Sequence, residues 1–250
     1  MNSLHGSNIT SDPENPAENP FVVAHNASIT KMTIEDVLSD SNRRLVRARF
    51  SKTSMFEYLN TLSDLELREK YVRFHDKHRY FDQVCAGAKH HHWWVGGLQD
   101  HCREMTGVAL DMFSLYRGDL EGKVTRDDII IGVYLHDFAK IWTYEFITDE
   151  DRERAPKKYL EQQLFKPING AFNIIDEESK TLLELARFGI IPTDTQWSAV
   201  LFAEGGYSDR NFTYGGRSRT GDTVMSHNPL AVMIHIADMY SSQVLGGSIA

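Results

Sequence analysis

Ile129-Ile-Ile-Gly-Val-Tyr-Leu-His-Asp-Phe-Ala-Lys140 is the stretch of sequence that decides the fold. Its apolar residues predict a buried helix, yet His136 and Asp137 stand where that helix should continue. Ionisable side chains in apolar surroundings cost free energy unless a partner compensates them. A divalent cation would compensate both side chains, so this pair predicts a metal site within a helical core.

A second helix is predicted upstream of this stretch. Apolar residues with helical spacing between positions 98 and 115 predict a helix from about 97 to 117, and His101 lies on its apolar face. A loop over residues 117–123 leads to Thr125-x-x-Asp128, a pattern typical of a helix start, which opens the helix that carries His136. A short connection favours an antiparallel helix pair. We therefore expect His101 to lie near His136.

A third helix is predicted towards the end of the sequence. Asn228 followed by Pro229 is typical of a helix start and predicts a helix through about Val244, with Asp238 inside it. Residues 204–222, before this helix, are rich in Gly and Arg. A loop of this length in a compact domain is usually functional or disordered.

The rest of the chain divides into three parts. Residues 1–30 are rich in Asn, Ser and Pro and have little apolar periodicity, so we expect a flexible tail. Residues 31–84 predict a helical N-terminal extension that packs on the core, although two short segments in its first half fit strands equally well. Residues 85–250 form the main domain, with further helices over 177–188 and 196–203. Because no series of strands is evident, the predicted class is mainly α.

The composition narrows the possible functions. A formal charge of −8 argues against a surface that coats nucleic acid, although a local cluster can still bind a small anion. No window approaches the run of about 18 apolar residues that a membrane span needs, and no signal peptide is evident, so we expect a cytoplasmic protein. The two cysteines, Cys85 and Cys102, are predicted to be reduced, and neither has a Cys-x-x-Cys partner. Any metal should therefore be held by nitrogen and oxygen atoms.

The proposed metal ligands are His101, His136, Asp137 and Asp238, which come from three predicted helices. Imidazoles combined with carboxylates suit Mn, Fe, Co, Ni or Zn, whereas a set of oxygen atoms alone would indicate Mg or Ca. Each residue taken alone is better explained as part of a hydrogen-bonded core, and the joint pattern favours the metal. Such an ion assists phosphoester hydrolysis, and Lys140 would add positive charge towards a phosphate.

The four proposed ligands resemble the H...HD...D signature of the HD-domain metal-dependent phosphohydrolases. Residues 88–101, Ala-Lys-His-His-His-Trp-Trp-Val-Gly-Gly-Leu-Gln-Asp-His, are similar to the HHxxxGGLxxH segment of HD-domain 3′-to-5′ exoribonucleases. Residues 234–238, Ile-His-Ile-Ala-Asp, are similar to their final LHxAD helix. The resemblance covers roughly residues 85 to 245 and implies an HD-domain helical bundle over 85–250, preceded by an irregular or flexible N-terminal extension.

The sequence departs from the exoribonuclease pattern in two places. Where a histidine-rich segment is expected before the last helix, this chain has Phe202-Ala-Glu204-Gly, and no histidine stands between His136 and His227. We therefore expect one metal ion per chain, unless Glu204 is a further ligand, and we keep Glu204 as a catalytic candidate. Those exoribonucleases also carry an OB-type nucleic-acid-binding domain. The first 80 residues here show neither its strands nor a basic surface, which favours a small substrate.

The sequence also offers candidates for substrate binding. By resemblance, His91 and His92 occupy the family's paired histidines and would contact phosphate or support the metal; a surface run of histidines is the alternative. Arg217 and Arg219 can make bidentate contacts with phosphate, although solvated loop arginines are common. His235 lies three residues before Asp238, and we expect it to make a supporting hydrogen bond.

The leading hypothesis is a phosphohydrolase that cleaves a phosphoester of a nucleotide or short oligonucleotide, with a metal-bound hydroxide attacking phosphorus. Asp137 and Lys140 are its main catalytic candidates. Three alternatives stay open: a 3′-to-5′ exonuclease on single strands, an HD-type di-iron oxygenase, and a degenerate HD domain that binds a nucleotide or a partner. The Gly-Gly-Leu element is also similar to HD-type relaxases of conjugation, although this chain is short for one. The sequence leaves a homo-oligomer open.

Overall fold

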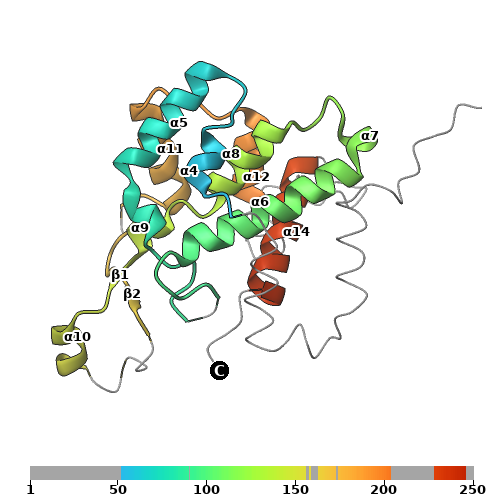
Figure 1. Ribbon diagram of the computed structural model, residues 1–250. Coiled ribbons are helices and arrows are strands. Elements are labelled where there is room, and N and C mark those ends of the chain that lie inside the picture. The colour runs from blue at the N-terminus through green and yellow to red at the C-terminus, as the bar shows by residue number, and fades with distance from the viewer. Residues whose placement is uncertain are drawn as a thin grey trace, which may run out of the picture. The chain divides into compact units, whose positions relative to one another are not determined.

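A computed structural model describes residues 52–89, 91–155, 158, 163–172, 174–203 and 228–245. These residues are mainly helical, which confirms the predicted class. The elements, labelled in Figure 1 where there is room, are α4 (Met55–Leu59), α5 (Leu65–Lys77), the 3₁₀ helix η2 (Arg79–Asp82), α6 (Gly97–Leu115), α7 (Arg117–Leu120), α8 (Arg126–His136), α9 (Lys140–Thr143), β1 (Tyr144–Phe146), α10 (Asp149–Arg154), β2 (Phe165–Pro167), α11 (Glu177–Arg187), α12 (Asp194–Phe202), α14 (Pro229–Met239) and the π-helix η5 (Tyr240–Leu245).

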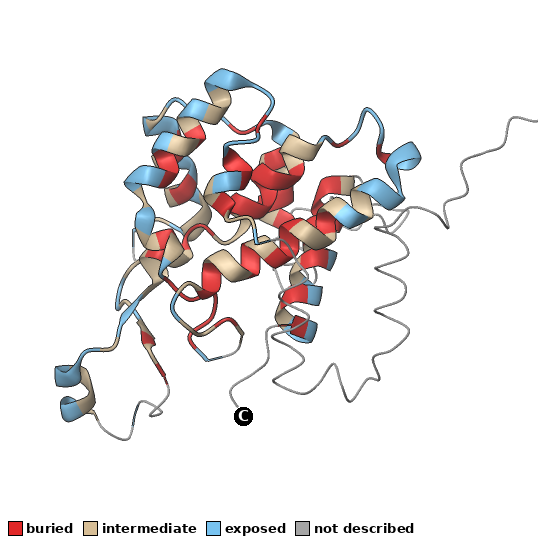
Figure 2. Ribbon diagram, in the orientation of Figure 1, coloured by how far each residue is buried: buried red, intermediate tan, exposed pale blue. Residues whose placement is uncertain are grey.

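Three helices, α6, α8 and α14, pack against one another at the centre of the described fold, and α12 packs against α8 and α14 (Figure 1). Buried residues line the sides on which these helices meet (Figure 2). The helices are those predicted to carry His101, His136 and Asp238. Their mutual packing therefore brings the three parts of the proposed site together.

The predicted helix starts are confirmed by hydrogen bonds. The Thr125 hydroxyl accepts from the backbone N–H of Asp128, and the Asp128 carboxylate accepts from the backbone N–H of Thr125 at 2.9 Å. At the start of α14, the Asn228 side chain accepts from two backbone amides of the first turn, and Pro229 occupies the first helical position. Both arrangements satisfy N–H groups that a helix leaves unpaired at its start.

At Gly132 the backbone of α8 lies against the side chain of Ile234 on α14. A Cβ atom at position 132 would lie 2.5 Å from Cδ1 of Ile234 on α14, which is closer than van der Waals contact allows. The glycine therefore lets the helix that ends in His136 lie directly against the helix that carries Asp238.

The part of the N-terminal extension that is described shares this core. α4 and α5 follow the predicted helical segments, and buried residues on them, including Met55, Tyr71 and Phe74, belong to the same hydrophobic cluster as α6 and α8. Residues 1–51, including the proposed flexible tail, lie outside the described residues, so the domain boundaries stay predictions.

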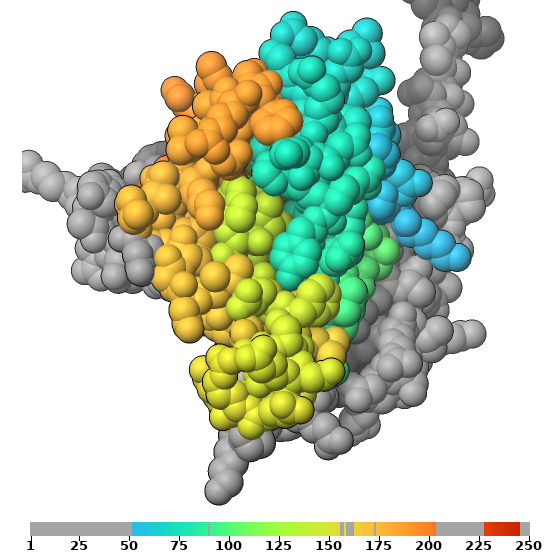
Figure 3. Space-filling view, turned by 90° about the vertical axis from the view of Figure 1, so that its left-hand side faces the viewer, coloured from blue at the N-terminus to red at the C-terminus, as the bar shows by residue number. Residues whose placement is uncertain are grey.

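The sequence did not predict the small sheet formed by β1 and β2. The two antiparallel strands pair Tyr144 with Pro167 and Phe146 with Phe165. Each strand has three residues, which is too short for periodicity to detect. The charged segment after β1 forms α10, a helix without a buried residue, as expected of a solvated face. In Figure 3, α10 lies at the lower end of the face on which α5 lies at the top.

The loop predicted over residues 117–123 is partly helical, because α7 occupies residues 117–120. Cys85 and Cys102 are both buried and free, in line with the prediction that they are reduced. None of the helices among the described residues is long and apolar enough to cross a membrane.

Candidate metal centre

The end of α8 explains how two adjacent residues reach one site. His136 is the last residue of the helix, and Asp137 is its C-cap, with φ −118° and ψ 15°. Neighbours within a helix point in different directions. Because Asp137 has left the helical conformation, its carboxylate can lie near the His136 ring, and its Oδ2 atom is 3.7 Å from His136 Nε2.

His101 and His136 meet through their Nε2 atoms, which lie 3.3 Å apart. Nδ1 of His136 lies 2.6 Å from the carbonyl oxygen of Val133, and because a carbonyl only accepts, Nδ1 donates. In the neutral ring, Nε2 of His136 then carries a lone pair directed at His101. Two ring nitrogens that lie 3.3 Å apart need a proton or a cation between them.

Two carboxylates complete the cluster. Asp238 Oδ1 lies 3.3 Å from His101 Nε2, and Asp137 Oδ2 lies 3.9 Å from the same atom. The His101 side chain is fully buried, whereas the Asp137 and Asp238 side chains keep 21% and 27% of their surface exposed. The cluster is therefore closed on the histidine side and open on the carboxylate side, where a ligand could approach.

The charges in the cluster shift its pKa values towards the ionised forms. Burial alone would raise the pKa of Asp137, but Lys140, His136 and His101 lower it overall. Burial also opposes ionisation of Asp238, and its hydrogen bond with His101 lowers its pKa. Without a metal, burial disfavours the charged form of His101, but Asp238 and Asp137 raise its pKa overall. Asp137 and Asp238 are thus both held in the ionised form, Asp137 beside His101 and His136 and Asp238 beside His101.

This arrangement fits a divalent transition metal. Two imidazole nitrogens that each bind one tetrahedral ion at about 2.0–2.1 Å are separated by roughly 3.3 Å, the spacing seen between His101 and His136. Ligand atoms of His101, His136 and Asp137 all lie within 4.8 Å of one another. The mixture of nitrogen and oxygen donors suits Mn, Fe, Co, Ni or Zn. The identity of the metal and the number of ions stay predictions.

Lys140 lies at the edge of the cluster. It is the first residue of α9, and its Nζ atom is 3.7 Å from Asp137 Oδ1. The Lys140 side chain is 22% exposed. An ammonium group is therefore held beside the open, carboxylate side of the proposed metal centre.

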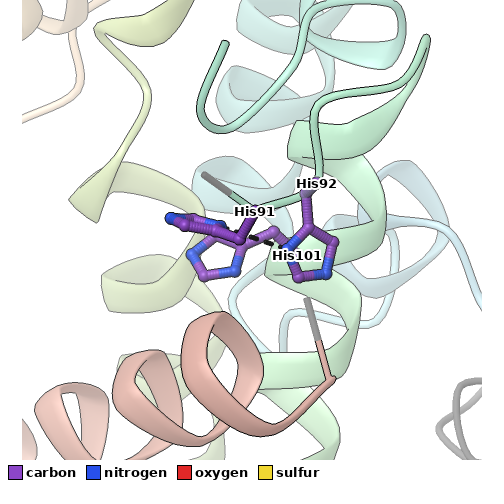
Figure 4. A group of neighbouring side chains, drawn as sticks. All are labelled: His91, His92 and His101. Carbon is purple, nitrogen blue, oxygen red and sulfur yellow. Dashed lines mark hydrogen bonds between the residues drawn. The ribbon is translucent and has the colours of Figure 1, made fainter. Parts of the chain in front are cut away.

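The loop before α6 places His91 and His92 against His101. The ring centroids of His91 and His92 each lie 5.0 Å from that of His101, and their own Nδ1 atoms are 3.2 Å apart (Figure 4). Burial lowers the pKa of His91 to about 4, with His101 adding to the effect. His92 is fully buried, and its Nε2 atom lies 2.9 Å from Glu104 Oε2. Because His92 is fully buried, support of the metal is a better interpretation for it than contact with phosphate or a place in a surface run of histidines.

Gly97 permits this loop to fold against the helix. A Cβ atom at position 97 would lie 1.8 Å from the carbonyl oxygen of His92. The preceding Gly96 has φ +80°, in the left-handed region that favours glycine. The Gly-Gly element of the sequence therefore has a structural reason: it lets the histidine loop lie directly on the start of α6.

Three predicted residues lie outside the described residues: Glu204, Arg217 and Arg219. Their proposed roles stay predictions. His235 is described, and its Nδ1 atom donates to the carbonyl oxygen of Ala203 at 2.7 Å, which is the kind of hydrogen bond expected for it.

Sequence analysis missed two residues of the site, Glu104 and Ser241. Both are fully buried, and each is hydrogen-bonded within the cluster. Glu104 lies three residues after His101 on a predicted apolar face, so an acidic residue in that stripe was a signal that could have been followed. Ser241, three residues after Asp238, offered no comparable signal.

A pocket of about 560 Å³ lies beside the small sheet of β1 and β2. Its described lining comprises Ala88, Lys89, Tyr144, Glu145, Asp151, Arg154, Ala155, Lys158, Gln163, Lys166, Pro167 and Asn169. Burial raises the pKa of Tyr144, the lining residue that follows α9. The pocket is mixed in charge, because Lys166 is paired with Asp151 at 2.6 Å.

The chain is similar to dihydroneopterin 2′,3′-cyclic phosphate phosphodiesterase of Methanocaldococcus jannaschii, with 33% identity over 101 residues. The aligned part covers 36% of this chain and 40% of that protein, so the chain spans less than half the length of the relative it matches. No protein-family model and no solved structure matches the chain. The similarity to a phosphodiesterase supports the resemblance to HD phosphohydrolases and supports a hydrolytic enzyme. It does not bear on the finer resemblance to exoribonucleases.

Proposed function

We propose that this protein is a metal-dependent phosphohydrolase that cleaves a phosphoester of a nucleotide or short oligonucleotide. The observation that carries the proposal is the 3.3 Å approach of His101 Nε2 to His136 Nε2, with two carboxylates beside them. Two imidazole nitrogens at this distance need a proton or a cation between them, and a divalent cation would also account for the two carboxylates. A bound divalent ion would acidify a water molecule and polarise a phosphoryl oxygen.

The residues of the chain would divide the work. His101, His136, Asp137 and Asp238 would hold the ion on the open side of the cluster. Lys140, 3.7 Å from Asp137, would attract the phosphate and stabilise the charge that develops on it. Asp137 and Asp238 raise the pKa of His91, but burial has the larger effect and lowers it to about 4. The His91 imidazole is therefore neutral at pH 7. It would therefore offer phosphate a hydrogen bond without adding charge.

The pocket beside β1 and β2 would hold the rest of the substrate. A volume of about 560 Å³ falls in the range of small-molecule sites. Tyr144 supplies an aromatic surface and Lys89 a charge on its wall. The name of the relative indicates a cyclic phosphodiester as its substrate, so we place 2′,3′-cyclic phosphates of nucleosides and pterins first among the compounds to test.

The experiment is a substrate panel with defined metals. Metal-free protein is supplied with Mn, Co, Ni, Zn, Fe(II) or Mg and incubated with cyclic phosphodiesters, nucleoside mono-, di- and triphosphates, and an end-labelled oligonucleotide, and the products are resolved by mass. We expect hydrolysis of a small phosphoester with a transition metal. Stepwise shortening of the oligonucleotide would indicate the exonuclease instead. If no phosphoester is cleaved with any metal, the proposal is wrong.

A further inference from the structure

A buried carboxylate, Glu104, lies behind the proposed metal ligands. It is on α6, one turn after His101, and its side chain is fully buried. Its Oε2 atom accepts a hydrogen bond from the Ser241 hydroxyl at 2.9 Å and lies 2.9 Å from Nε2 of His92. A buried carboxylate is costly unless it is well paired. The two contacts hold it at a fixed place beside the cluster.

The protons along this chain of contacts can be assigned. Ser241 has a single hydroxyl proton, and it is donated to Glu104. Towards Nδ1 of His101, 3.0 Å away, the Ser241 oxygen can therefore offer only a lone pair. Nδ1 of His101 must be the donor in this hydrogen bond. In the neutral ring, the other nitrogen, Nε2, is then free of a proton.

Nε2 is the nitrogen that faces the rest of the cluster. It lies 3.3 Å from both His136 Nε2 and Asp238 Oδ1. Ser241 and Asp238 are three residues apart, so one segment of chain contacts both nitrogens of the His101 ring. Ser241 lies in the π-helix that follows α14, and turns of this kind are frequent at functional sites.

We propose that Glu104 and Ser241 are positioning residues for His101: the carboxylate orients the serine hydroxyl, and the serine oxygen fixes the imidazole tautomer that presents Nε2 to a cation. His92 would help to hold the same carboxylate oxygen in place. This inference rests on the proposed function, because it assumes that the cluster binds a divalent metal. Outer partners of this type typically contribute roughly 10–100-fold to metal affinity.

Two substitutions test the tautomer directly. Glu104→Gln keeps the size of the side chain, but its amide can donate to the Ser241 oxygen and turn the hydroxyl towards His101. Ser241→Ala removes the acceptor altogether. For each variant, Co²⁺ is titrated into metal-free protein, and the dissociation constant and the visible absorption bands of the bound ion are measured. We expect roughly 10–100-fold weaker binding and altered bands in both variants.

Matched variants separate positioning from folding. Ser241→Thr retains the hydroxyl and should bind Co²⁺ close to wild-type affinity with the same bands. Thr106→Val removes another buried hydroxyl of α6, one that donates to the Cys102 carbonyl at 2.8 Å, and should leave Co²⁺ binding unchanged. Circular dichroism and thermal unfolding of each metal-free variant report whether the fold is kept.

The outcomes distinguish this inference from the proposed function. If wild-type protein binds Co²⁺ and hydrolyses a phosphoester, but Glu104→Gln and Ser241→Ala bind Co²⁺ as tightly and with the same bands, the positioning role is wrong and the proposed function stands. If Thr106→Val weakens binding as much as they do, a general loss of packing explains the effect and the positioning role is again wrong. If the wild-type protein binds no divalent metal, both proposals fail.

Discussion

Nε2 of His101 lies 3.3 Å from Nε2 of His136, although 35 residues separate them in the chain. The contact exists because α6 and α8 pack side by side, and because Val133 fixes the His136 ring from behind. Because Nδ1 of His136 donates to Val133, the two Nε2 atoms need a proton or a cation between them.

Replacing His136 with alanine should remove the metal. With one nitrogen donor lost, we expect the metal content after purification without chelator to fall and phosphoester hydrolysis to drop by more than about 100-fold, the upper end of what an outer partner contributes. Elemental analysis and a rate assay measure the two effects. His235→Gln is the matched control, because His235 bonds to a backbone carbonyl and should leave metal content unchanged. Full metal content in His136→Ala would contradict the proposed ligand set.

Replacing Lys140 with alanine should impair the reaction without releasing the metal. Its ammonium lies 3.7 Å from Asp137 and is placed to stabilise charge on a phosphate, an effect worth roughly 10²–10³-fold in kcat. Steady-state kinetics and metal analysis are compared with Lys70→Ala, which removes a lysine paired with Glu66 on the surface of α5. We expect Lys140→Arg to recover part of the rate. Unchanged kcat in Lys140→Ala would exclude the role.

Replacing Gly97 with alanine should destabilise the fold. The added Cβ would lie 1.8 Å from the backbone oxygen of His92, which cannot move without displacing the histidine loop. We expect a loss of about 1–3 kcal/mol or more in the free energy of unfolding, measured by urea denaturation. Gly118→Ala is the control, because nothing lies within 4 Å of its added Cβ, and it should stabilise α7 by about 0.5 kcal/mol. Equal stability of the two variants would show that the loop adapts.

The stability of the protein should depend on the protonation of His78. This imidazole packs among Phe74, Phe138, Trp142 and Phe188, and burial lowers its pKa. In the unfolded chain the pKa returns to about 6.5. As the pH falls below that value, the unfolded state binds the proton first, so the free energy of unfolding decreases.

The corresponding test compares the wild type with His78→Phe, which suits the aromatic surroundings and cannot be protonated. Urea denaturation is carried out at about pH 7.5 and about pH 5.5, on either side of the unfolded pKa. We expect a smaller loss of stability between the two pH values in the variant. An identical loss in both proteins would show that other groups account for the acid sensitivity.

The sequence was sufficient to predict the helices and their starts, because these depend on neighbouring residues. Thr125-x-x-Asp128 and Asn228-Pro229 are local signals, and the structure confirms both. It was not sufficient for β1 and β2, whose pairing joins residues about 20 positions apart through backbone hydrogen bonds.

The candidate site also contains residues that the sequence indicates and residues whose role only the structure reveals. His101, His136, Asp137 and Asp238 could be singled out because polar residues in apolar helices need a partner. Glu104 gave the same kind of signal, as an acidic residue in an apolar stripe, but Ser241 gave none, and the role of both comes from hydrogen bonds that join α6 to the segment after α14. The burial of His92 likewise depends on the loop that Gly97 allows to fold against α6.

By itself, the sequence determined which residues form helices and which of them carry metal-type ligands, because periodicity and capping act over a few residues. Only the tertiary structure decided that His101 and His136 face each other at 3.3 Å and that Ser241 lies behind His101. These distances depend on the packing of α6, α8 and α14, and the close approach at Gly132 is part of that packing. Side chains from three helices can bind one ligand together only because this packing places them close to one another.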